Sequence, residues 1–175
     1  MDVSDLLLDG FGRILHNVQT CLDGLSPEQL VFRPDEQANS IGWLAWHLTR
    51  VEDDHVADLA GRPQAWIERG WHARFDRPAD EDDTGFGDTA EDVARLRPAS
   101  AGLLLDYYQA VHTRSLDYLR GLQPADLDRV LDEPWWDPPV TVGVRLVSVL
   151  DDCLQHSGQM AYVRGLIEAR HWYPA

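Results

Sequence analysis

The stretch GVRLVSVLDDCLQHSGQMAYVRGLIEA, residues 143–169, is the longest helical pattern in the chain. It contains no proline, and its apolar residues recur at the three- and four-residue spacings of one helix face. We therefore predict one continuous helix over this stretch, long enough to run the length of a helical bundle.

Three further helices follow from the same periodicity, and glycine or proline ends each of them. The expected ranges are Val3–Leu22, Ile41–Ala60 and Ala99–Arg120. The segment between the second and third helices is long and irregular, with one short helix expected after the capping signature at Thr89. No run of strands is evident. The sequence thus predicts an all-α four-helix bundle with a long crossover between helices two and three, folded as a single domain over residues 1–175.

The composition is that of a globular protein with an acidic surface. Fifteen basic and thirty acidic residues give a formal net charge of −15. Such a surface repels phosphate backbones and anionic lipid headgroups, so neither nucleic acid nor a membrane is expected as a partner. No stretch approaches the ~20 apolar residues of a membrane span. Two cysteines, Cys21 and Cys153, are too few for a disulfide framework, and together these features favour a cytoplasmic protein.

A line of polar side chains runs along the fourth predicted helix. Val149, Asp152, His156, Gln159 and Val163 fall on one side of it, with apolar residues at both ends of the line. A carboxylate and an imidazole four residues apart project the same way, and together they can bind a divalent cation. They can equally form a simple hydrogen-bonded pair, and the spacing alone leaves both interpretations open.

A cation would need a third ligand from another helix, and His47 is the candidate. It lies among apolar and aromatic residues of the second helix, where a buried imidazole needs a polar partner. A satisfied core histidine is the alternative interpretation. His55, two turns further on, follows several acidic residues and is expected on a solvated face. The run Asp80–Asp83 is likewise expected to be solvated.

Other reaction classes find no support in the sequence. The chain has neither a Gly-x-Ser-x-Gly nucleophile elbow nor a phosphate-binding glycine loop. Trp43 and Trp46 belong to the second helix and are expected in the core. Trp135 and Trp136 lie in a proline-rich loop before the fourth helix, where they would line a pocket or form a dimer contact.

Two stretches of the chain resemble a known family. Residues 39–55 (NSIGWLAWHLTRVEDDH) and 151–165 (DDCLQHSGQMAYVRG) together are similar to the DinB/YfiT-like superfamily, and most of all to its actinobacterial mycothiol-transferase branch. The resemblance covers essentially the whole chain. A histidine followed by x-Gly-Gln, combined with a Trp-His-Leu histidine about one hundred residues upstream, is its most specific feature.

The resemblance implies a four-helix bundle with a divalent metal, commonly zinc or nickel, near one end. By position, the metal ligands would be His47, Asp152 and His156, which would act in catalysis through the metal. Many members have histidine at the first position of the helix-four pair, and this chain departs from them with Asp152. The resemblance also implies a low-molecular-weight thiol such as mycothiol as co-substrate, and a homodimer.

The reaction expected from such a site is transfer of the thiol to an electrophilic small molecule, because a metal-bound thiol loses its proton near neutral pH. Gln159 is expected to orient a ligand by hydrogen bonding or to support the metal ligands from outside. Arg50 is expected to bind an anionic group of the thiol or substrate, or to pair with Asp54. Two alternatives remain: a non-enzymatic metal-binding bundle, and a thiol-dependent isomerase. Isomerases of this kind usually carry a second C-terminal domain, for which a chain of 175 residues leaves no room.

Overall fold

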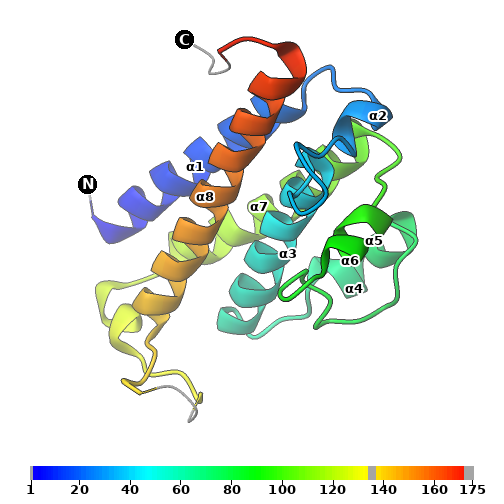
Figure 1. Ribbon diagram of the computed structural model, residues 1–175. Helices are drawn as coiled ribbons and strands as arrows, with labels where there is room; N and C mark the ends of the chain where they lie inside the picture. The colour runs from blue at the N-terminus through cyan, green and yellow to red at the C-terminus, as the bar shows by residue number, and fades with distance from the viewer. Residues whose placement is uncertain (1, 134–136, 172–175) are drawn as a thin grey trace.

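Four long helices form the bundle that the sequence predicts (Figure 1). In this computed structural model, residues 2–133 and 137–171 are described. Each long helix begins at a side chain that accepts a hydrogen bond from the backbone three residues further on, which caps the helix. The helices and their capping residues are α1 (Val3–Leu22, Asp2), α3 (Ile41–Leu59, Ser40), α7 (Ala101–Gly121, Ser100) and α8 (Val142–Glu168, Thr141).

The long helices pack in the cyclic order α1, α7, α3, α8, so α3 and α8 are neighbours. The side chain of Arg164, near the end of α8, donates to the carbonyl of Thr20 near the end of α1, so these two helices are parallel. Gly42 at the start of α3 lies 3.2 Å from Pro98, just before α7, measured from its ideal Cβ position. Helices α3 and α7 are therefore also parallel, and the chain must return along the bundle between them.

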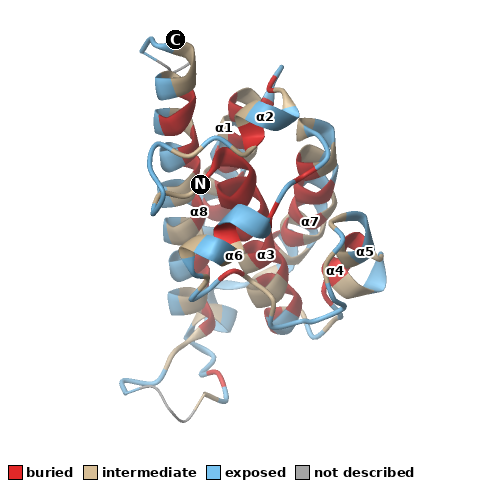
Figure 2. Cartoon of the chain, turned by 45° about the vertical axis from the view of Figure 1, so that its right-hand side comes forward, coloured by how far each residue is buried: buried red, intermediate tan, exposed pale blue. Residues whose placement is uncertain are grey.

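The returning segment is the predicted long crossover, and it covers one side of α3 (Figures 1 and 2). Its short helix α6 begins at the capping box of Thr89, as the sequence predicts. The other four short elements were not predicted as helices, because four or five residues are too few to show a helical period. The short helices are α2 (Pro27–Leu30), α4 (Ala65–Glu68), α5 (Trp71–Arg74), α6 (Ala90–Arg95) and the 3₁₀ helix η1 (Pro124–Asp128).

The core lies along the facing sides of the four long helices, whose buried residues are coloured red in the cartoon of Figure 2. Trp43 and Trp46 are buried, as predicted, and both cysteines are buried free thiols. Among the described residues, β pairing is limited to one isolated bridge between Val130 and Thr141. No helix in the described ranges combines the length and apolarity needed to cross a bilayer. The predicted Trp135–Trp136 loop lies outside the described residues.

Candidate metal site

Three side chains from two antiparallel helices converge between α3 and α8. His47 comes from α3, and Asp152 and His156 come from successive turns of α8. The Oδ1 atom of Asp152 lies 3.9 Å from Nε2 of His47 and 3.4 Å from Nε2 of His156. One ligand atom from each residue lies within 4.8 Å of the others. Donors that bind one ion at about 2.0–2.2 Å each lie at most about 4.4 Å apart, and both distances from Asp152 fall within this limit.

The imidazole of His47 is held by the crossover. Its Nδ1 atom lies 2.6 Å from the carbonyl oxygen of Thr84. A carbonyl only accepts hydrogen bonds, so Nδ1 carries the proton and donates it, and the Nε2 lone pair is directed toward Asp152. An imidazole whose far nitrogen donates to an oxygen is the arrangement that orients histidines as metal ligands.

The imidazole of His156 is held in the same way from within α8. Its Nδ1 atom lies 2.9 Å from Oε1 of Gln159, one turn further along the helix. Burial lowers the pKa of His156, but the hydrogen bonds with Asp152 and Gln159 outweigh it, so the pKa lies above its usual value. Both imidazoles therefore present Nε2 to one carboxylate.

The Asp152 carboxylate supplies the test of whether this group fits a cation. Its Oδ2 atom is buried and has no hydrogen-bond partner among the described residues. A buried carboxylate oxygen left unpaired costs free energy, and a divalent cation is a strong partner for it. One carboxylate and two oriented imidazoles suit zinc or nickel, so the residues present fit the metal expected from the sequence.

Aromatic packing restricts His47 further. The ring of Trp43 stacks on the imidazole with a centroid distance of 4.6 Å and an interplanar angle of 13°. Gly85 covers the same imidazole, and an ideal Cβ on it would lie 3.0 Å from Nδ1 and 2.8 Å from the Trp46 ring. The φ angle of Gly85 is +88°, so both its conformation and its close approach favour glycine. This enclosure lowers the pKa of His47, mainly through burial.

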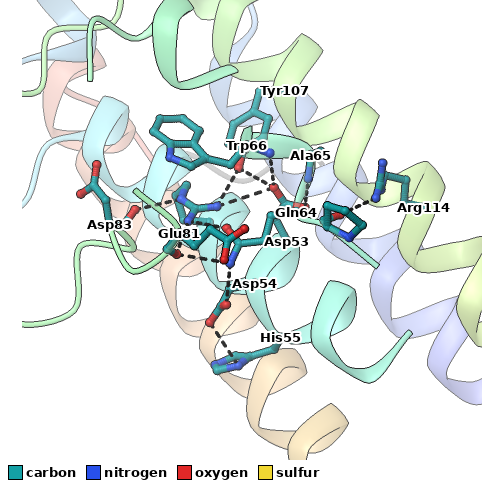
Figure 3. Close-up of polar contacts among 12 residues, drawn as sticks. Asp53, Asp54, His55, Gln64, Ala65, Trp66, Glu81, Asp83, Tyr107 and Arg114 are labelled. Atoms are coloured by element: carbon teal, nitrogen blue, oxygen red, sulfur yellow. Dashed lines mark hydrogen bonds and ion pairs between the residues drawn. The ribbon is translucent and has the colours of Figure 1, made fainter. Parts of the chain in front are cut away.

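Arg50 is fully buried and holds the segment that carries Thr84. Its guanidinium donates to the carbonyls of Glu81 and Asp83, at 2.9 Å each. Figure 3 shows Glu81 and Asp83 within the polar network of α3. Its nearest ion pair is with Asp53, at 3.6 Å, and not with the expected Asp54. In this arrangement Arg50 fixes the backbone beside the site and presents no exposed surface to a ligand.

A cavity of about 420 Å³ opens beside two of the three converging side chains, His47 and Asp152. Its wall includes His55, which we expected on a solvated face and which instead is half-buried beside Arg145, at 3.0 Å. Part of the acidic run is also paired, because Asp83 forms an ion pair with Arg77. The cavity is lined by His47, Val51, Asp54, His55, Thr84, Phe86, Ser148 and Asp152.

The structure thus brings the three predicted ligands together, with Gln159 beside His156 and Arg50 one helical turn behind His47. Sequence analysis missed Thr84 and Gly85. A backbone carbonyl leaves no mark in a sequence. Gly85 is part of a Gly-x-Gly pair in an irregular segment, which indicates positive φ angles. Nothing in the sequence pattern connected this turn to His47.

Comparisons with known proteins assign the chain to a family. A crystal structure of a conserved protein from Enterococcus faecalis superimposes with a TM-score of 0.89 at 31% identity, covering 97% of this chain and 99% of that one. A DinB-like protein from Bacillus cereus shares the fold, with a TM-score of 0.61 at 19% identity over 97% of this chain and 95% of that one. No curated protein matches. The family model for mycothiol-S-transferase matches residues 7–169, and the chain therefore belongs to this DinB-like family.

Proposed function

We propose that the protein is a metal-dependent thiol S-transferase that joins a low-molecular-weight thiol to an electrophilic small molecule. The observation that carries the proposal is the convergence of His47, Asp152 and His156, with both imidazoles oriented by oxygen acceptors. Two of the three residues, His47 and Asp152, line a cavity. Family membership supports the same reaction class.

His47, Asp152 and His156 would hold the cation, and three protein ligands leave positions free for a substrate. When bound, a divalent cation lowers the pKa of a coordinating thiol and so favours the thiolate at neutral pH. The carboxylate of Asp152 contributes a negative charge that a third histidine would lack. The carbonyl of Thr84 and the amide of Gln159 keep both imidazoles in the tautomer that leaves Nε2 free.

The overall reaction is a displacement. The sulfur of the thiol forms a bond to the electrophilic carbon, and the bond from that carbon to its leaving group breaks with its electron pair. The thiol proton passes to solvent through the cavity. Zinc or nickel is the metal we propose, and mycothiol or a similar thiol is the co-substrate. A reduced thiol pool of this kind is a property of the cytoplasm, where we place the reaction.

Metal content tests the first half of the proposal. Protein purified without a metal-affinity tag should contain close to one zinc or nickel per chain by elemental analysis. The His47→Ala variant should lose this metal, whereas His16→Ala, at an exposed position on α1, should retain it. Equal metal content in the two variants would exclude the site.

Thiol consumption tests the second half. Metal-loaded protein is incubated with mycothiol and iodoacetamide, and the conjugate is measured by mass spectrometry. The rate should exceed the uncatalysed rate with the intact protein and fall to it in His47→Ala. A protein that binds metal without accelerating conjugation would be the non-enzymatic bundle.

We also propose that the protein forms a homodimer through the outer face of α8. Five large apolar side chains are exposed there at spacings that keep them on one side of the helix. They are Val144, Val147, Leu154, Tyr162 and Leu166. Sedimentation should show a dimer that Leu154→Lys converts to a monomer, and a monomeric unmodified protein would refute this assignment.

A further inference from the structure

We propose that Phe86 determines which electrophile the site accepts, and that it selects molecules with an aromatic or branched apolar body. This inference rests on the proposed function and names the class of its second substrate. Phe86 lines the same cavity as His47 and Asp152. Its side chain is 94% exposed, more than any other large apolar side chain among the described residues.

The turn that carries Phe86 is fixed to α3 on both sides. Before it, the Thr84 carbonyl accepts the hydrogen bond from His47. After it, a carboxylate oxygen of Asp88 accepts a 2.9 Å hydrogen bond from Nε1 of Trp43. The backbone N–H of Asp88 also donates to the carbonyl of Gly85, which closes the turn. Phe86 is therefore held at a defined place beside the metal site.

The glycines on either side of Phe86 explain how the turn is made. Gly85 and Gly87 have φ angles of +88° and +83°, a conformation that L side chains rarely adopt. Gly85 packs against the aromatic rings of α3, whereas nothing lies within 4 Å of an added Cβ at Gly87. The backbone thus lies close to the site at Gly85 and turns into open space at Gly87.

An exposed phenylalanine on a fixed turn gains no burial in the free protein. An apolar ligand in the cavity would cover part of its ring and recover that burial. Val51 of α3 adds a second apolar side chain to the same lining. Asp54, His55 and Ser148 are polar and line it as well, which leaves Phe86 and Val51 as the apolar surface for the body of the electrophile.

The substrate class is therefore an aryl or branched alkyl electrophile with a displaceable group. In the reaction, its carbon gains a bond to the thiol sulfur and loses the bond to the leaving group, which departs with the electron pair. The apolar body stays against Phe86 throughout and contributes binding free energy.

Binding of dinitroaniline tests the inference without any reaction. This aryl compound carries no group that a thiolate displaces, and it quenches tryptophan fluorescence, for which Trp43 beside His47 is a reporter. Zinc-loaded protein should bind it, and Phe86→Ala should weaken binding about tenfold. This change corresponds to about 1.4 kcal/mol, which is near the upper end of what an aromatic contact contributes. Phe86→Leu should retain most of the affinity. Phe32→Ala removes an exposed phenylalanine outside the cavity and should leave it unchanged.

Conjugation of mycothiol gives the matching kinetic test. The ratio of kcat/KM for chlorodinitrobenzene to kcat/KM for iodoacetamide should fall about tenfold in Phe86→Ala and stay constant in Phe32→Ala. An unchanged ratio, or affinity for dinitroaniline within twofold of the original, would overturn the role of Phe86 even if iodoacetamide is conjugated. Failure to conjugate either electrophile would instead contradict the proposed function, and the binding measurement would still decide the role of Phe86.

Discussion

Among the described residues, two carboxylate–imidazole groups join α3 to a neighbouring long helix, and only one of them is arranged to bind a ligand. Between α3 and α8, His47 and His156 face Asp152, and His47 and Asp152 line a cavity. Between α3 and α7, Oε1 of Glu52 lies 3.9 Å from Nδ1 of His112, and both residues are buried. The same residue types therefore occur in two different environments.

Orientation is the first difference between them. Each imidazole of the cavity group donates from Nδ1 to a fixed oxygen. In the buried pair, Nδ1 of His112 and both oxygens of Glu52 have no hydrogen bond of normal geometry to any described residue. A ligand set needs directed lone pairs, and only the cavity group has them.

Charge is the second difference. Burial raises the pKa of Glu52 to about 7, against a smaller opposing effect of the Ser115 and Tyr108 hydroxyls. Burial also lowers the pKa of His112 to about 4. Between these values both groups are neutral in the folded protein. An apolar enclosure thus makes such a pair neutral, whereas access to a cavity lets a carboxylate–imidazole group hold a cation.

The largest expected effect separates the two groups by metal binding. His156→Ala removes a ligand and should weaken zinc binding by far more than the about 100-fold that marks the upper end for outer-shell changes. His112→Ala should leave zinc binding unchanged while lowering the free energy of unfolding, because it creates a buried cavity. Competition with a chelator measures zinc binding, and urea denaturation measures the free energy of unfolding. Loss of zinc in His112→Ala would show that the buried pair also takes part in metal binding.

The second prediction concerns the pH dependence of stability. The folded protein holds a proton on Glu52 up to about pH 7, whereas the unfolded chain releases it near 4.5. The contribution of Glu52 to stability is therefore full below pH 4.5 and is lost as the pH rises through about 7. Glu52→Gln should gain about 3 kcal/mol relative to the original protein between pH 4.5 and pH 8. Urea denaturation at both values checks this, and Glu36→Gln, at an exposed position, should show no such trend.

The third prediction tests the orientation of His47. Gly85→Ala puts a Cβ against Nδ1 of His47 and the Trp46 ring, which should displace the Thr84 carbonyl and weaken zinc binding about 10- to 100-fold. Gly87→Ala puts an alanine in the same positive-φ conformation but with no neighbouring atom, so it controls for backbone strain without the steric contact. Equal zinc affinities for the two variants would show that the Thr84 contact has no part in metal binding.

The smallest expected effect concerns His156. Gln159→Ala removes the acceptor at Nδ1 and should weaken zinc binding up to about tenfold, since the exposed site lets water replace the amide. Gln155→Ala, also exposed on α8 and bonded to Asp151, should have no effect. A loss of affinity in Gln155→Ala as large as that in Gln159→Ala would assign the effect to the helix and not to the hydrogen bond.

The long helices were predictable because each has one strong apolar face and clear end signals. The predicted range for α1 is the observed one, and those for α3, α7 and α8 differ by one or two residues at either end. The short elements α4 and α5 were not predictable. They depend on tertiary contacts. In α4, for example, the Asp53 carboxylate accepts hydrogen bonds from the backbone N–H groups of Ala65 and Trp66.

The candidate site was predictable where side chains define it and unpredictable where the backbone does. Asp152 and His156 share a helix face, so their proximity follows from spacing alone. The approach of His47 required the pairing of α3 with α8, which the residues alone left open and the family resemblance supplied. Nothing in the residue pattern indicated that Arg50 would bind carbonyls of the crossover, because an arginine near acidic residues predicts an ion pair with a side chain.

Three side chains about one turn apart on α3 form hydrogen bonds to the crossover between Glu81 and Asp88. They are Trp43, His47 and Arg50. Helix and crossover are therefore joined at three points, and the contact between His47 and its acceptor does not involve α8. The three ligands can then separate only at the contact between α3 and α8, if one helix shifts relative to the other. An ion bound by all three side chains would link α3 to α8. Hydrogen exchange in the middle turns of both helices should therefore slow together when metal is added.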